Sequence, residues 1–173
     1  MTKRDKKLLA ELVDAAVQDH AKARQLLKKH PDLVEASFND LNETPLHFLA
    51  VEGYAVGVRF LAEAGANVNC VNDFGDTPLA DVACLGNHEV ARILLTHGAD
   101  PNAASSGHDN VLHAAVGSGN AALVDALLSA GAVGDYVTEL EETVFDALPK
   151  RGAKRQSVLA VLRKHGLSGG PTQ

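Results

Sequence analysis

Residues 72–104 read NDFGDTPLADVACLGNHEVARILLTHGADPNAA, and several features of this stretch return every 33 residues. Its Thr-Pro-Leu triplet, residues 77–79, corresponds to triplets beginning at Thr44, Asn110 and Thr143. Glycines keep the same period in two columns, one with Gly53, Gly86, Gly119 and Gly152, the other with Gly65, Gly98 and Gly131. A period kept at several columns over four units indicates a repeat architecture rather than an isolated motif.

One unit can be interpreted from its residue types. Thr44 is suited to cap a helix N-terminus, and Pro45 is suited to the first turn of a helix about eight residues long. Gly53 ends that helix, a second helix is predicted over residues 55–64, and Gly65 suits the left-handed position after it. A polar, turn-rich stretch follows. Helices this short are marginal alone, so each unit must bury its apolar side against its neighbours.

On these residues the chain resembles the ankyrin-repeat proteins, over about residues 5–167. The resemblance implies an all-α solenoid of helix–turn–helix units with hairpin-like tips. We expect five helical pairs in one domain. The first is an N-terminal capping pair whose helices break near Asp19–His20 and end at Pro31. The expected segments are the cap over 1–38, repeats over 39–71, 72–104 and 105–137, a degenerate capping repeat over 138–167 and a flexible tail over 168–173.

The sequence contains no motif for a catalytic, metal or cofactor site. His47 and His113 share a column with Ala80 and Asp146, so no common chemistry requires an imidazole there. The resemblance implies that this imidazole joins neighbouring units. The other histidines lack metal-ligand spacing, and no glycine-rich phosphate loop or nucleophile elbow is present. We therefore predict a protein that is not an enzyme, with no catalytic residues, no metal and no cofactor.

The N-terminal stretch and the two cysteines bear on location. Glu11 and Asp14 interrupt the first apolar run, which argues against a signal peptide or a transmembrane span, and we expect no membrane association. Cys70 and Cys84 are fourteen residues apart and match no metal or redox spacing. Two such thiols favour a cytoplasmic protein.

Charge is distributed unevenly along the chain, whose net charge is −6. From Glu35 to Glu142 there are two basic residues against sixteen acidic ones, a net charge of −14, whereas the two ends together carry +8. A strongly acidic centre disfavours nucleic acid as a partner, because it repels phosphates.

Acidic residues also follow the repeat. One column precedes the helix caps, and a second lies three residues earlier, with apolar residues between the two. The resemblance places these columns at the hairpin tips, which ankyrin proteins commonly use for binding. Stacked units lie about 8–10 Å apart, so such carboxylates would form a ladder unsuited to sharing one cation. The candidate contacts are Glu43, Asp76, Asp109 and Glu142 in the first column, Asp40, Asp73 and Glu139 in the second, and Leu41, Phe74 and Leu140 between them.

The predicted function is a protein–protein interaction module that binds a partner with a basic surface through the tips and the concave face. By resemblance the concave face adds Val51, Glu52, Cys84 and Leu85. More specific versions are an inhibitor or immunity-type protein, or a stress-protective partner of an enzyme. A remote alternative is an enzyme or small-molecule-binding protein with Cys84, His113 or Asp109 lining a pocket. A further alternative is that the acidic residues only cap solvated turns. We favour a monomer, although the sequence does not define the oligomeric state.

Overall fold

The computed structural model describes residues 3–37, 39–103, 110–138 and 141–168. Within these ranges the regular elements are helices, and isolated bridge geometry occurs at Asn110 and in the pair Val137 and Thr143. The expected all-α fold is therefore confirmed. The helices are α1 (Lys3–Gln18), α2 (His20–Lys29), the 3-10 turn η1 (Pro31–Val34), α3 (Pro45–Val51), α4 (Ala55–Glu63), α5 (Pro78–Leu85), α6 (His88–Thr96), α7 (Val111–Ser118), α8 (Ala121–Ser129) and α9 (Ala153–Lys164).

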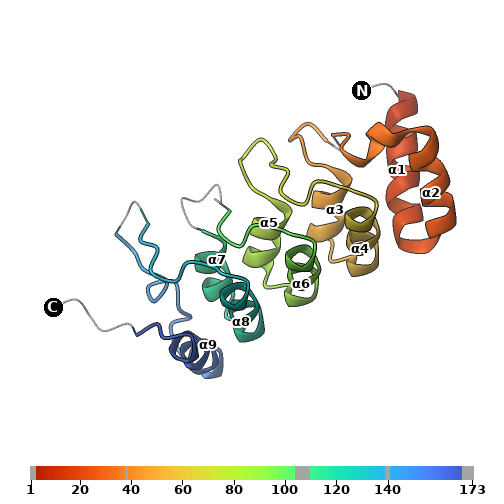
Figure 1. Cartoon of the computed structure of the whole chain (residues 1–173). Coiled ribbons are helices and arrows are strands. Elements are labelled where there is room, and N and C mark those ends of the chain that lie inside the picture. Colours follow the sequence, from red (N-terminus) through yellow and green to blue (C-terminus); the bar gives the residue numbers. More distant parts are fainter. Residues whose placement is uncertain (1–2, 38, 104–109, 139–140, 169–173) are drawn as a thin grey trace.

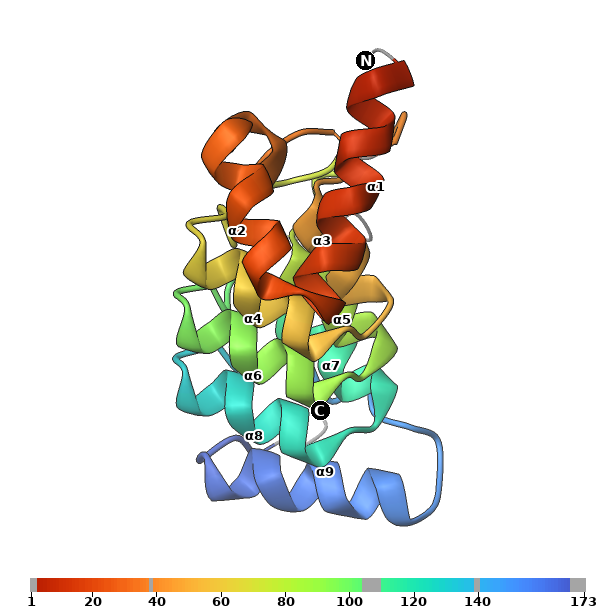
Figure 2. The same ribbon diagram turned by 90° about the vertical axis from the view of Figure 1, so that its right-hand side faces the viewer.

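Helices α1 to α8 stack in pairs along one axis, with α1 and α9 at opposite ends of the stack (Figure 1). Two layers run along this axis (Figure 2). Helices α3, α5 and α7 form what we call the inner layer, which lies between the projecting loops and the outer layer of α4, α6 and α8 (Figure 1). Within each layer every helix packs against its counterpart in the next unit. This arrangement is a solenoid.

Capping residues define where the helices begin. The Thr44 hydroxyl accepts a hydrogen bond from the backbone N–H of His47, and Pro45 occupies the first turn of α3. Asp19 separates the two helices of the N-terminal cap and accepts a hydrogen bond from Lys22 N–H at 3.0 Å. Gly65 follows α4 with a φ of 95°, in the left-handed region that glycine adopts without strain.

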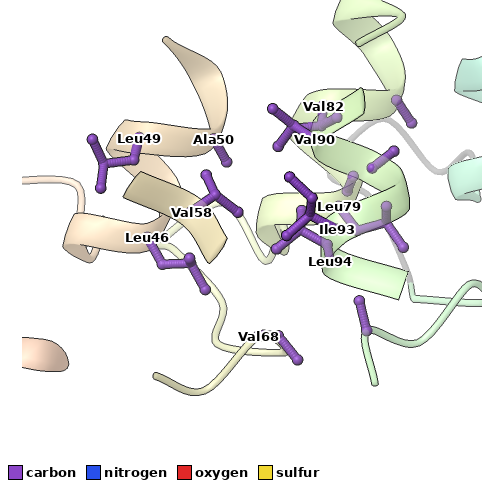
Figure 3. Close-up of a cluster of buried hydrophobic side chains, with 14 of the residues drawn as sticks. Leu46, Leu49, Ala50, Val58, Val68, Leu79, Val82, Val90, Ile93 and Leu94 are labelled. Atoms are coloured by element: carbon purple, nitrogen blue, oxygen red, sulfur yellow. The ribbon is translucent and has the colours of Figure 1, made fainter. Parts of the chain in front are cut away.

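The core continues from one unit into the next. Fully buried side chains of α3 and α4 face those of α5 and α6 across the junction between units (Figure 3). Burying one such aliphatic side chain contributes about 1.5–3 kcal/mol. No unit encloses its own apolar side, so the neighbouring units stabilise one another. The labelled residues of this cluster are Leu46, Leu49, Ala50, Val58, Val68, Leu79, Val82, Val90, Ile93 and Leu94.

The prediction of a fifth helical pair is wrong, because among the described residues of the last unit, 141–168, no helix precedes α9. Residues 144–147 form a turn, in which Asp146 N–H donates to Thr143 O and Leu148 N–H to Phe145 O. The Asp146 carboxylate accepts hydrogen bonds from the backbone and hydroxyl of Thr143, both at 2.8 Å. Pro149 explains why the turn does not continue as a helix: it has no N–H to donate, and its ring would clash with the preceding turn.

No helix among the described residues is both long enough and apolar enough to cross a membrane.

Candidate functional site

The candidate site consists of the tips that precede α3 and α5, together with the exposed ends of these helices. The structure describes the first two tips, residues 39–43 and 72–76, and Glu142. Asp109, Glu139 and Leu140, which the sequence analysis included, lie outside the described residues.

An asparagine side chain holds the second tip in shape. The Oδ1 atom of Asn72 accepts hydrogen bonds from the N–H groups of Phe74, at 3.0 Å, and Asp76, at 3.1 Å. The Asn72 N–H in turn donates to the Asp76 carbonyl at 3.1 Å. This closed turn leaves Asp73 exposed and 58% of Phe74 accessible to solvent.

The first tip uses the same device. The Oδ1 atom of Asn39 accepts from Leu41 N–H at 3.0 Å and from Glu43 N–H at 3.3 Å, while its Nδ2 donates to the Glu43 carboxylate at 2.6 Å. The N–H of Asp73 donates to the Leu41 carbonyl at 3.0 Å and joins the two tips. The sequence analysis missed Asn39 and Asn72, although their spacing of one period was a visible signal.

The residues of the two acidic columns differ in how far they are buried. Asp40 and Asp73 are exposed, whereas Glu43 is half-buried and Asp76 is only 8% exposed. The ladder of equivalent carboxylates expected from the sequence is thus interrupted at Asp76. Glu142 is exposed, as are the predicted helix-end residues Val51, Glu52, Cys84 and Leu85.

His47 lies behind the tips and joins the first two units. Its Nε2–H donates to the Asp76 carbonyl at 3.2 Å, and its Nδ1 accepts from Thr44 N–H at 3.2 Å. Burial lowers the pKa of this imidazole, against the opposing effect of the Asp76 carbonyl and nearby carboxylates. His113 donates in the same way to the Thr143 carbonyl at 2.6 Å. This geometry gives both imidazoles a structural role between units.

Asn69 and Asn102 join units on the outer side. Asn69 Nδ2 donates to the Gly98 carbonyl at 3.0 Å, and its Oδ1 accepts from Asp100 N–H at 2.8 Å. Asn102 repeats the pattern one unit further along, with Gly131 and Val133. These side chains therefore act between units.

Asp81, on α5, is a feature that the sequence analysis missed. Its Oδ2 atom is inaccessible to solvent and has no hydrogen-bond partner. Burial raises the pKa of this carboxyl to about 6, and the charges of Asp76 and Glu43 add to the effect. A signal was present in the sequence, because Phe48 and Ala114 occupy the same place in the neighbouring units.

The Cys70 thiol is not activated as a nucleophile in this geometry. The Sγ atom of Cys70 lies 3.6 Å from His47 Nδ1 and 3.5 Å from Thr44 Oγ1. Burial raises the pKa of the Cys70 thiol, which disfavours the reactive thiolate. Among the described residues no group of three or more His, Cys, Asp or Glu side chains is placed to hold a metal ion.

Two hollows in the described part of the chain lie away from the first two tips. One, of about 890 Å³, lies in the C-terminal unit between residues 134–136, residues 141–148 and α9. The other, of about 490 Å³, lies where the α5–α6 and α7–α8 turns meet the start of α9. Cys84 and His113, named in the pocket-based alternative, line neither hollow.

Comparison with known families gives a consistent result. The family model described as ankyrin repeat matches residues 41–73, and the model described as ankyrin repeats in three copies matches residues 58–139. Together the two matches span more than half of the chain. A search of curated proteins gave no significant match.

Proposed function

Because the chain belongs to the ankyrin-repeat family, we propose that it binds a protein partner with a basic surface through its first two tips. Ankyrin repeats are generally protein–protein interaction modules, and proteins built from them are typically non-catalytic. We call the residues that carry the proposal the tip edge, which consists of Asp40, Leu41, Glu43, Asp73 and Phe74.

The observation that carries the proposal is the exposure of two large apolar side chains among carboxylates. Phe74 is 58% and Leu41 41% exposed, and Asp40 and Asp73 beside them are exposed too. Aromatic residues are enriched at the energetic centres of interfaces. Carboxylates around them favour the approach of a cationic surface and reject an anionic one.

The rigidity of the tips supports the same function. Asn39 and Asn72 hold both turns through backbone hydrogen bonds, so a partner would order little additional chain on binding. A preorganised surface loses less conformational entropy in a complex. Asp76, with its carbonyl bonded to His47, supports the tip rather than presenting its carboxylate.

The exposed ends of the inner helices extend the proposed surface. Leu85 is 59% and Val51 41% exposed, and Glu52 and Cys84 lie beside them in the sequence. By their place in the repeat, the acidic and apolar residues of the later tips would continue the edge: Asp109, Glu139, Leu140 and Glu142.

Affinity capture with matched charge variants tests the proposal. Asp40→Lys with Asp73→Lys reverses two charges at the tip edge, and Glu63→Lys with Glu89→Lys reverses two on exposed outer-layer positions. We expect the wild-type chain and the outer-layer variant to capture the same partner and the tip variant to lose it. With the purified partner, calorimetry should show that Phe74→Ala weakens binding about thirtyfold.

Equal capture by all three proteins would contradict the proposal, as would equal loss in both double variants. If the captured partner is an enzyme, assaying it with and without the chain distinguishes an inhibitor from a protective partner.

A further inference from the structure

Positive charge gathers at one end of the N-terminal cap. Helices α1 and α2 run antiparallel and pack against each other, so the start of α1 and the end of α2 lie at the same end of the pair (Figure 2). Exposed cationic side chains stand at both of these helix ends. Asp5 and Asp32 lie beside them in the sequence and offset two of the five positive charges, which leaves a net charge of +3. We call the cationic residues the basic end, which consists of Arg4, Lys6, Lys7, Lys28 and Lys29.

These five side chains have no charged partner within the described part of the chain. The ion pair described in the cap joins Lys22 to Glu11 at 3.3 Å. Among the described residues no hydrogen bond or ion pair involves a side chain of the basic end. At the other end of the stack, by contrast, Lys164 Nζ lies 2.8 Å from the Asp125 carboxylate. The basic end is therefore available for a contact outside the chain.

The stability of α1 does not account for its cationic residues. Arg4, Lys6 and Lys7 lie in the first two turns of α1, where the positive end of the helix dipole favours acidic side chains and disfavours basic ones. Lys28 and Lys29, in the last turn of α2, do match the dipole of their helix. Residues that conflict with a local rule are expected where a protein interacts with something else. The start of α1 is such a place.

The neighbouring tips limit how long an anionic partner of the basic end can be. The start of α1 lies on the side of the stack from which the tips project (Figure 1). The exposed carboxylates of Asp40 and Asp73 belong to the first two of these tips. A long polyanion such as nucleic acid would meet these carboxylates as well and be repelled by them. A short anionic segment would contact the cations alone.

The packing of α1 argues against a membrane surface as the partner. Leu9, Leu12 and Val13 form the apolar side of α1, and all three are buried in the core of the stack. A helix that lies on a bilayer inserts its apolar side between the lipids. Helix α1 has already used that side for folding, so a short acidic segment of a protein fits the basic end better than a lipid surface does.

We propose that the basic end binds a short segment of a protein that carries several aspartate or glutamate side chains. The site is separate from the tip edge, selects the opposite charge and stands without the proposed function. Exposed ion pairs are weak one by one and are screened by salt, so binding depends on several pairs formed together. Raising the salt concentration from about 50 mM to about 200 mM should weaken the complex severalfold.

NMR titration of the full chain with a defined peptide tests this contact. The probe is acetyl-hexaglutamate amide, and acetyl-hexaglutamine amide, of the same length but uncharged, is its control. We expect the glutamate peptide to shift the amide signals of residues 4–7 and 28–30 saturably, and the glutamine peptide to leave them unchanged. Residues 150–154 include Lys150, Arg151 and Lys154 and serve as an internal control, whose signals should not move.

Matched charge reversals locate the binding energy. Lys6→Glu with Lys7→Glu should weaken binding of the glutamate peptide about tenfold, measured by fluorescence anisotropy. Lys150→Glu with Arg151→Glu makes the same change of charge at the other end of the stack and should leave binding unchanged. Acidic residues suit the start of a helix, so the α1 variant should keep its fold, which circular dichroism checks.

Equal signal shifts at residues 4–7 and 150–154 would overturn the inference, because they would show attraction to any cationic segment. So would equal loss of binding in the two double variants. Tighter binding of a short DNA duplex, or of vesicles containing an anionic lipid, than of hexaglutamate at the same salt concentration would also overturn it. Failure of the proposed function would appear separately, as partner capture that is indifferent to the tip variants.

Discussion

Helices α3 and α5 occupy equivalent places in the inner layer but differ at the two positions after their shared Pro-Leu. In α3 these positions hold His47, which bonds to the next unit, and Phe48, which packs against the core. In α5 they hold Ala80, which has no side-chain donor, and Asp81, whose Oδ2 atom has no partner. Equivalent positions thus stabilise the fold in α3 and lower its stability in α5.

The difference separates structural positions from candidate functional ones. A repeat needs each unit to hold its neighbour, and α3 shows how an imidazole does this. Helix α5 has no such bond at Ala80, and the next residue, Asp81, carries an Oδ2 atom that is inaccessible to solvent and has no hydrogen-bond partner. In a protein that is otherwise consistent from propensity to packing, such local conflicts are expected at sites of interaction.

Of the changes considered, removal of the His47 imidazole from α3 should lower the free energy of unfolding most. His47→Ala deletes a fully buried side chain and removes the hydrogen bonds that the imidazole makes with Thr44 N–H and with the Asp76 carbonyl. We expect a loss of about 3 kcal/mol in the free energy of unfolding, measured by urea denaturation. His88→Ala, at a half-buried outer-layer position, is the control and should cost far less. Similar losses in both variants would refute a special role for His47.

Neutralising Asp81 in α5 should instead raise the free energy of unfolding at neutral pH. Its pKa is raised to about 6, above the unfolded value of about 3.9, so the folded chain binds an extra proton between these values. Stability therefore falls as pH rises from about 4 to about 6. Asp81→Asn should be more stable than the wild type at pH 7 by about 1–2 kcal/mol, a figure reduced for partial solvent screening. Near pH 4 the two should be equal.

Urea denaturation at both pH values measures this difference. Asp73→Asn, at an exposed tip position, is the matched control and should stay within about 0.5 kcal/mol of the wild type. An Asp81→Asn variant less stable than the wild type at pH 7 would mean that the carboxylate has a stabilising partner in solution.

The smallest expected effects concern the cap residues of the same two helices, Thr44 of α3 and Thr77 of α5. Thr77→Ala removes one hydrogen bond, from Ala80 N–H to the threonine hydroxyl, and should cost about 1 kcal/mol. Thr44→Ala should cost more, because the Thr44 hydroxyl also lies 3.1 Å from His47 Nδ1. Thermal unfolding of both variants measures the order, and equal losses would show that the imidazole adds nothing to the cap.

The elements followed from the sequence because their signals are local. A helix over residues 55–64 was predicted, and α4 runs over Ala55–Glu63. The prediction of a helix before α9 was wrong for a reason that the sequence contains. Pro149 falls inside the expected helix, but the prediction gave more weight to the repeat pattern than to this proline. Periodicity identifies equivalent positions, but it does not show that the local chemistry at each one still permits a helix.

The candidate site was less predictable, because equivalent carboxylates have different surroundings. Glu43 and Asp76 occupy the same column, yet only Asp76 is almost fully buried. Asn39 and Asn72 are one period apart, but that spacing does not show what an asparagine in a polar stretch does. Their importance appears only when each Oδ1 is seen accepting two backbone hydrogen bonds.

The sequence by itself determined the repeat, the order of the helices and the acidic character of the tips, since capping, period and charge can be read from neighbouring residues. The tertiary structure decided which carboxylates meet water and which do not. Desolvation depends on side chains about one repeat away along the chain, brought into contact only when the units stack. Asp81 shows this most clearly: the sequence places it in a column with Phe48 and Ala114, but only the folded structure shows that its Oδ2 atom is inaccessible to solvent.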